Sequence, residues 1–240
     1  MNSSKIPRIV TPLAIATAIV VSFRAGPSSR PVELSPGEPP APSASETRSA
    51  LALGLAPDGP GHDRGATRAP VTVVEFADFG CRYCARFAAE SWPYLEREFV
   101  ATGRVRWRYV PFALGMFRNG DEAARAAECA ADQGAAAFGR MHDVLYLLQD
   151  EWKGAGDVTV AFRSIAAMAR LDLGRFASCY AGPVPGRRLN ASNLLADQLG
   201  VRATPTFFID GQRVEGALPV QEFRYLLLEA LRKSREDSTR

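Results

Sequence analysis

The sequence predicts an α/β domain that is interrupted by a block of helices and preceded by a segment without regular structure. Two apolar runs, at 71–76 and 206–209, and an alternating run at 105–110 are typical of strands. Between the run at 105–110 and the run at 206–209 lies an alanine-rich stretch, about 112–186, with a helical pattern. Hydrophobic residues make up 47% of the 240 residues, which is enough for one domain with additional segments.

The N-terminus has the pattern of an export signal. Lys5 and Arg8 precede an uncharged, largely apolar run from Ile9 to Phe23. A basic start with a short apolar stretch is typical of secretory signals, and a spanning helix needs ~17–25 apolar residues. No clear cleavage site follows, so residues 1–23 are either a cleaved signal peptide or a retained signal anchor. Both place the folded part outside the cytoplasm, in the periplasm or cell envelope.

Residues 24–62 are expected to be a disordered linker. Six prolines fall between residues 27 and 42, with serine, alanine and glycine among them. Such a composition buries too little apolar surface to offset the entropy lost on ordering. The folded domain is expected to cover 63–235.

The overall charge argues against nucleic-acid binding. The formal charge is +3, from 29 basic and 26 acidic residues. Proteins that bind nucleic acids carry a basic patch or stripe, and the sequence has no such stripe with interleaved aromatics.

The expected elements of the domain follow in order from the strand at 71–76. A helix over 85–100 carries apolar residues at helical spacing, and Pro93 inside it predicts a kink. The strand at 105–110 alternates, which predicts one face in contact with water. Helices are expected over 121–132, 135–149, 158–169, 174–180 and 187–199. Asp210-Gly211 predicts a hairpin between 206–210 and 212–214, and Pro219 opens a last helix to about 233.

Cys81 and Cys84, two residues apart, lie between the first strand and the first helix. A helix N-terminus stabilises an anion, so it lowers the thiol pKa of Cys81, and we expect Arg82 to act in the same direction. Cys84, one turn further on, is expected to be more buried and less acidic. A disulfide with one good leaving sulfur is an oxidant. The pattern therefore predicts a redox-active pair.

The alternatives for this pair are a zinc site and a structural disulfide. A zinc site needs two further ligands, and the chain has only two histidines, while Cys129 and Cys179 stand alone. A purely structural Cys81–Cys84 disulfide would sit at the start of a helix, which is a strained place for one. We therefore expect redox chemistry and no metal site.

Motifs along the chain, taken together, resemble the DsbA-like family of thioredoxin-fold proteins, often grouped as thioredoxin_4 or DSBA-type domains. The resemblance covers about 63–235. It implies a thioredoxin fold with an inserted α-helical domain. The matching segments are 69–79 before the Cys81–Cys84 motif, 129–134, Phe138 with 142–143, and 200–211.

The resemblance implies a proton-handling acid next to the cysteines. Glu75 lies where the family commonly has a buried carboxyl group. Burial would raise its pKa, and it could then exchange protons with the Cys84 thiol. The alternative is a residue at a strand end that points into solvent.

The resemblance also implies a substrate-binding groove. Thr204-Pro205 matches the family's cis-proline loop, which lies beside the active-site sulfur and offers backbone pairing to a client chain. Phe79, Arg82 and Tyr83 are expected to line the same groove.

A structural disulfide in the helical insertion is a further implication. Some members of the family carry one, and two lone thiols in an oxidising compartment tend to pair. Cys129 and Cys179 are therefore expected to be bonded. His142, on the same insertion, is expected to be a structural residue.

The implied function is an extracytoplasmic thiol–disulfide oxidoreductase that introduces disulfides into exported proteins. It needs no cofactor beyond the Cys81–Cys84 disulfide. Its expected partners are unfolded or reduced exported proteins and a membrane quinone-linked oxidase that regenerates the disulfide. A reductase or isomerase on the same fold, or a non-enzymatic envelope binding module, are the alternatives. Arg82-Tyr83 replaces the Pro-His of strongly oxidising members, and Ala203 replaces a frequent glycine, so the direction of the chemistry stays open.

Overall fold

The computed structural model describes residues 43, 45, 47–48, 51–52, 56 and 59–239. The expected signal segment 1–23 and most of the expected linker lie outside the described residues. Among the helices that are described, none is both long and apolar enough to cross a membrane.

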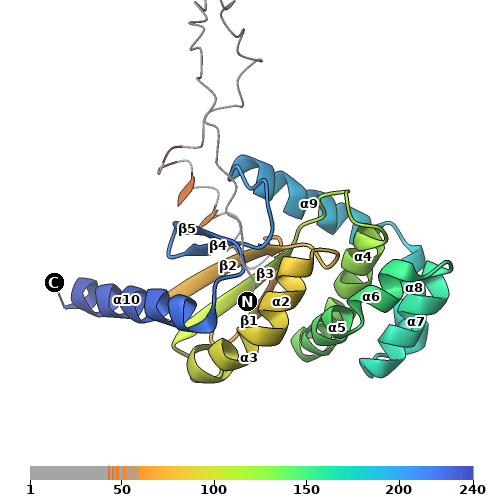
Figure 1. The fold of residues 1–240 in the computed structure, drawn as a ribbon, viewed down its shortest axis with the longest axis horizontal. Helices are drawn as coiled ribbons and strands as arrows, with labels where there is room; N and C mark the ends of the chain where they lie inside the picture. Colours follow the sequence, from red (N-terminus) through yellow and green to blue (C-terminus); the bar gives the residue numbers. More distant parts are fainter. Residues whose placement is uncertain are drawn as a thin grey trace, which may run out of the picture. The chain divides into compact units, whose positions relative to one another are not determined.

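A five-stranded mixed sheet forms the centre of the domain, in the order β1-β3-β2-β4-β5 (Figure 1). β2 pairs in parallel with β3 and antiparallel with β4, so it is central and buried on both faces. This position explains its continuous apolar sequence. The strands are β1 (His62–Arg64), β2 (Val71–Ala77), β3 (Val105–Pro111), β4 (Thr206–Ile209) and β5 (Gln212–Glu215).

Strand β1 was not predicted from the sequence. Its three residues are polar and show no apolar alternation. It forms because it pairs antiparallel with β3 at the sheet edge. Asp63 on β1 accepts hydrogen bonds from Arg106 at 2.7 Å and from Arg108 at 2.7 and 2.8 Å. The face of β3 that was expected to contact water is therefore partly covered by β1, and Arg108 is buried.

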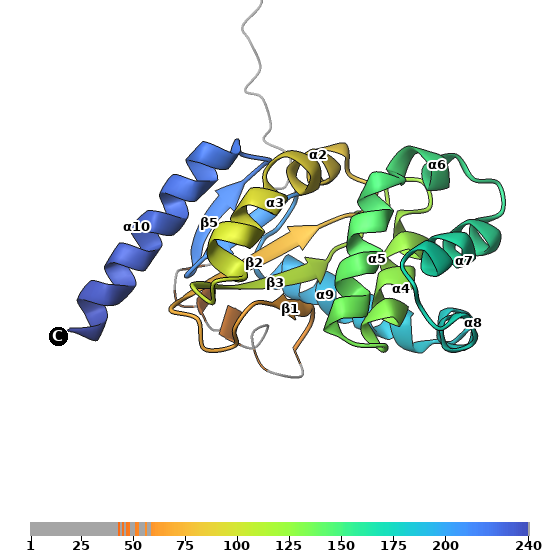
Figure 2. The same cartoon turned by 90° about the horizontal axis from the view of Figure 1, so that it is seen from below.

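Helices cover both faces of the sheet, as Figures 1 and 2 show. On one face, aromatic and aliphatic residues of α2, α3 and α10 pack on Val73, Trp107 and Phe207. On the other, α9 packs through Leu195 and Ala196. The helices on these two faces are α2 (Arg82–Glu90), α3 (Trp92–Leu95), the π-helix η1 (Glu96–Val100), α9 (Val184–Gln198) and α10 (Val220–Ser238).

The interruption predicted at Pro93 is confirmed. The expected helix over 85–100 is divided into α2, α3 and η1, and Pro93 lies in the first turn of α3. Proline has no N–H to donate to the preceding turn, so it is tolerated at a helix start and breaks a helix interior.

A block of five helices packs at one end of the sheet (Figure 2). The sequence predicted four of them, with boundaries off by a few residues. The expected helix over 135–149 ends early, and a separate short helix follows Leu148. The helices are α4 (Gly120–Ala131), α5 (Ala135–Leu147), α6 (Gln149–Gly154), α7 (Val158–Met168) and α8 (Leu173–Ala181).

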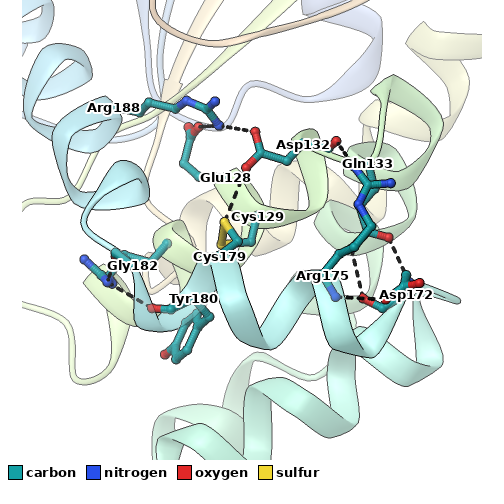
Figure 3. Close-up of a disulfide and its surroundings, with 11 residues drawn as sticks. Glu128, Cys129, Asp132, Gln133, Asp172, Arg175, Cys179, Tyr180, Gly182 and Arg188 are labelled. Carbon is teal, nitrogen blue, oxygen red and sulfur yellow. Dashed lines mark hydrogen bonds and ion pairs between the residues drawn. A yellow bond between two sulfur atoms is a disulfide. The ribbon is translucent and has the colours of Figure 1, made fainter.

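A disulfide and an ion-pair cluster tie this block together and to the sheet edge. Cys129 on α4 and Cys179 on α8 are bonded, with a Cα–Cα distance of 5.6 Å, which is the pairing expected from the resemblance. Figure 3 shows Glu128 and Asp132 beside this bond, both facing Arg188 of α9. Glu128 also bonds His62 of β1 at 2.9 Å. A disulfide that closes 50 residues restricts the unfolded chain and so stabilises the fold.

Candidate active site

The cysteine pair lies where the central strand ends and the first helix begins. Cys81 is the N-cap residue of α2, and Cys84 lies one turn into that helix. Both are free thiols and both are buried. They belong to the same packed cluster as Phe79 and the helical block, so they sit at the junction of sheet and insertion.

The surroundings of Cys81 stabilise its thiolate. The pKa of Cys81 falls to about 5 from an ordinary value of 9.0. Hydrogen bonding to the Cys84 side chain is the largest cause. Burial opposes it, while the Thr204 side chain and the backbone N–H groups of Cys84 and Tyr83 add to the lowering. Free N–H groups at a helix start thus act on the sulfur as the sequence predicted.

The surroundings of Cys84 have the opposite effect and stabilise its protonated thiol. Burial, together with the neighbouring Cys81 and Glu75 charges, raises the pKa of Cys84 well above 9.0. The two thiols therefore differ strongly in acidity. Such an asymmetric pair has one good leaving sulfur, Cys81, and one thiol that holds its proton.

The guanidinium of Arg82, which was expected to act on Cys81, is held by the side chain of Tyr83. It lies over the Tyr83 ring, 4.7 Å from the ring centroid, and donates to the Tyr83 hydroxyl at 2.7 Å. Arg82 is absent from the main causes of the Cys81 pKa shift. The backbone and Cys84 supply that effect instead. Both Arg82 and Tyr83 are exposed beside the pair.

Glu75 is a buried acid, as the resemblance implied. It lies within β2 and its exposed fraction is 4%, so the alternative of a solvent-facing strand end is wrong. Trp107 Nε1 donates a hydrogen bond to its carboxylate at 2.8 Å. Burial raises the pKa of Glu75 to about 7, against the opposing Trp107 bond and the Arg64 charge. Its charge acts on Cys84, so the two groups are close enough to interact.

The Thr204–Pro205 peptide bond is cis and lies beside Cys81. Cys81 Sγ lies 3.3 Å from the Thr204 carbonyl oxygen, to which it donates a hydrogen bond when it is protonated. Thr204 and Pro205 are both buried, and the Pro205 carbonyl accepts a hydrogen bond from the N–H of Gly216. The loop is thus fixed against the redox pair.

Comparisons with known proteins agree with this geometry. The family model Thioredoxin_4, described as thioredoxin, matches residues 58–229. The chain belongs to this family. Its sheet, helical block and cysteine placement together form a DsbA-like thioredoxin fold.

Solved members of the fold are similar over most of the domain. α-DsbA1 of Wolbachia pipientis has a TM-score of 0.68 and 22% identity, covering 79% of this chain and 98% of that one. BdbD of Bacillus subtilis in its oxidised form has a TM-score of 0.65 and 20% identity, covering 72% and 93%.

Among curated sequences, the Na(+)/H(+) antiporter NhaA 3 of Salinispora tropica is 38% identical over 176 residues. The match covers 72% of this chain but 25% of the antiporter, so the chain spans about a quarter of that relative's length. Disulfide bond formation protein D of Bacillus subtilis is 24% identical, covering 70% of this chain and 76% of that protein.

Phe79, which was expected to line the substrate groove, is buried instead. The Phe79 side chain is 1% exposed and packs against the rings of Tyr109, His142 and Tyr146. It cannot offer a surface to a client, because the helical block covers it. His142 is buried in the same cluster, where burial lowers its pKa, which suits the expected structural role.

The sequence did not reveal three further residues of the site, because each has a hydrogen-bond partner that is distant in the sequence. Asp78, also buried, accepts hydrogen bonds from the N–H groups of Gly80 at 2.8 Å and Leu114 at 2.9 Å. Burial raises the pKa of Asp78 to about 6. On α6, Gln149 donates to the Cys81 carbonyl at 3.0 Å, and Lys153 to the Gly80 carbonyl at 2.7 Å. These bonds fix the loop that carries Cys81.

No metal-binding cluster was expected. In the part of the chain that the structure describes, no three histidine, cysteine or acidic side chains come together as a possible metal site.

We expect the Cys81 thiol to titrate near pH 5 and the Cys84→Ala variant to titrate at higher pH. The Cys84 side chain makes the largest contribution to the lowered pKa, so its loss leaves the thiolate less stable. The measurement is the ultraviolet absorbance of the thiolate against pH, with Cys81→Ala as the blank. An unchanged midpoint in Cys84→Ala would contradict this origin of the acidity.

We also expect Glu75 to make folding stability depend on pH. Its pKa in the folded protein is about 7 against an ordinary 4.5, so the folded state keeps a proton that the unfolded state releases between these values. The free energy of unfolding therefore falls as pH rises through this window, by roughly 3 kcal/mol from this group.

The matched variant is Glu75→Gln, which can still accept the Trp107 hydrogen bond. Denaturant unfolding at several pH values compares the two proteins. The stability difference between wild type and variant should change by that amount across the window. A difference that stays constant with pH means that Glu75 does not titrate there.

Proposed function

We propose that this chain is an extracytoplasmic protein disulfide oxidoreductase that introduces disulfides into exported proteins. The observation that carries the proposal is the cysteine pair itself: an acidic Cys81 at the start of α2 beside a buried, weakly acidic Cys84. The redox group is the disulfide between them, and the reaction needs no organic cofactor or metal.

The proposed reaction begins with the Cys81–Cys84 disulfide. A client thiolate attacks Cys81 Sγ, which forms a mixed disulfide and releases Cys84. A second client thiolate then attacks the client sulfur of that bond, and Cys81 leaves as a thiolate. Two electrons pass from the two client thiols to the pair. The client gains a disulfide, Cys84 gains a proton, and the other client proton goes to solvent.

Glu75 is the proposed proton carrier for Cys84. It is buried beside that thiol and its pKa of about 7 lets it hold or release a proton near neutral pH. Cys84 keeps its proton in the reduced state because burial raises its pKa. The Thr204–Pro205 loop, fixed beside Cys81, is the proposed backbone partner for the client chain, with Arg82 and Tyr83 on the exposed side.

The acidity of Cys81 supports the proposed direction of exchange. A stabilised Cys81 thiolate favours the reduced enzyme, so the disulfide form tends to oxidise its clients. A reductase that uses the same residues would have a lower reduction potential.

Two features support an extracytoplasmic location. The N-terminal residues 1–23 have the pattern of an export signal, and structural disulfides such as Cys129–Cys179 form and persist in oxidising compartments. Reduced or unfolded exported proteins are the proposed clients. A membrane quinone-linked oxidase is the proposed partner that restores the Cys81–Cys84 disulfide.

The test is oxidation of a reduced, unfolded test protein by the oxidised full chain, followed by regain of the test protein's activity. Cys81→Ser is expected to abolish oxidation. Cys84→Ser, loaded on Cys81 as a mixed disulfide with an aromatic thiol, is expected to release that thiol to a single-cysteine client. The client–Cys81 mixed disulfide that forms should persist on a non-reducing gel, because neither Cys84 nor a second client thiol can displace it. Full oxidation by Cys81→Ser would refute the assignment.

A further inference from the structure

We propose that Arg82, Tyr83 and Arg86 form a cationic clamp that favours client segments carrying carboxylates next to the reacting cysteine. This inference rests on the proposed function and names a substrate class for it. The clamp is defined by these three residues, all on the first turns of α2 directly after Cys81.

The clamp is held together by ring stacking. Tyr83 is 42% exposed. Arg82 lies over its ring at 4.7 Å from the centroid, and Arg86 at 5.4 Å. Arg82 also donates to the Tyr83 hydroxyl, and Arg86 donates to the Ala217 carbonyl at 3.3 Å. These neutral partners orient the two guanidinium groups without cancelling their charge.

Neither cation of the clamp forms an ion pair among the described residues. Some arginines of the domain are paired with carboxylates, namely Arg64, Arg106, Arg108, Arg188, Arg202, Arg213, Arg224 and Arg232. Arg82 and Arg86 belong to those that bind neutral groups instead. Nor is Arg82 a main cause of the Cys81 pKa shift. Their charge therefore remains available to a ligand, and a guanidinium can bind a carboxylate with two parallel hydrogen bonds.

The acids near the clamp leave it cationic. Glu90, one turn after Arg86, is exposed and makes no ion pair with it in the described structure, and Glu215 is paired with Arg213. Asp78 is buried and accepts bonds from two backbone N–H groups. Asp121 on α4 and Asp150 on α6 are exposed, and in the described structure neither forms an ion pair with Arg82 or Arg86.

A client cysteine that attacks Cys81 brings its neighbouring residues within reach of this clamp, because Arg82 is the next residue in the chain. Carboxylates in those positions gain attraction, and lysines meet repulsion. Each exposed pair contributes modestly, about two- to fivefold in rate. Two cations together should give about tenfold discrimination at low salt, and less at high salt as the charges are screened.

The test uses three dithiol peptides that differ only in the residues flanking their cysteines: glutamate, glutamine or lysine. The measured quantity is the second-order rate at which each reduces the oxidised full chain. Flanking charges also change the peptide thiol pKa, so each rate is divided by that peptide's rate with a neutral small-molecule disulfide. The ratio of glutamate to lysine peptides within one variant cancels any change at the cysteine pair.

The clamp variant is Arg82→Glu/Arg86→Glu. The matched control is Arg97→Glu, because Arg97 also lies over an exposed tyrosine, 5.4 Å from the Tyr94 ring centroid, on a different helical segment. Wild type and Arg97→Glu are expected to favour the glutamate peptide about tenfold at low salt. The clamp variant is expected to favour the lysine peptide.

A normalised ratio near one in the wild type, or an equal preference in the clamp variant and the wild type, overturns the clamp. Loss of the preference in Arg97→Glu also overturns it, since the selectivity then follows overall charge. The glutamine peptide separates this inference from the proposed function: if the wild type does not oxidise it, the oxidoreductase assignment itself fails.

Discussion

The stabilised thiolate at the start of α2 is the interaction on which the rest of the site depends. Cys81 has a pKa of about 5 because Cys84 and the helix backbone donate to its sulfur, which outweighs the opposing burial. Cys84 can donate because burial keeps it protonated. The central strand β2 ends just before both thiols and carries Glu75 into the same buried region. The acidity of Cys81, the buried proton-binding group Glu75 and the position of both cysteines therefore all arise from one strand–helix junction.

The inserted helices serve this junction as well as the core. Gln149 and Lys153, one turn apart on α6, both bind carbonyl groups of the loop that carries Cys81. Asp78 joins that loop to the segment after β3. The helical block thus fixes the geometry of the redox pair from one side, and the cis Thr204–Pro205 loop does so from the other. The exposed side that remains carries Arg82, Tyr83 and Arg86.

Much of the fold could be predicted because its signals are local. The apolar run of β2, the break at Pro93 and the helical spacing of the insertion all depend on nearby residues. The role of Cys81 also followed from its place before a helix. Long-range contacts could not be predicted: β1 forms only by pairing with β3, Phe79 is covered by the distant Tyr146, and Arg108 is buried because Asp63 neutralises it. The expected effect of Arg82 on the Cys81 pKa could not be checked from the sequence, which does not reveal that its guanidinium stacks on Tyr83.

The most direct test of the central claim is the reduction potential of the Cys81–Cys84 pair, measured against a glutathione series. A stabilised Cys81 thiolate predicts a potential well above that of thioredoxin, ~ −270 mV, and toward that of DsbA, ~ −120 mV. Such a value agrees with a disulfide donor. A potential near that of thioredoxin would contradict the account and indicate a reductase or isomerase on the same fold.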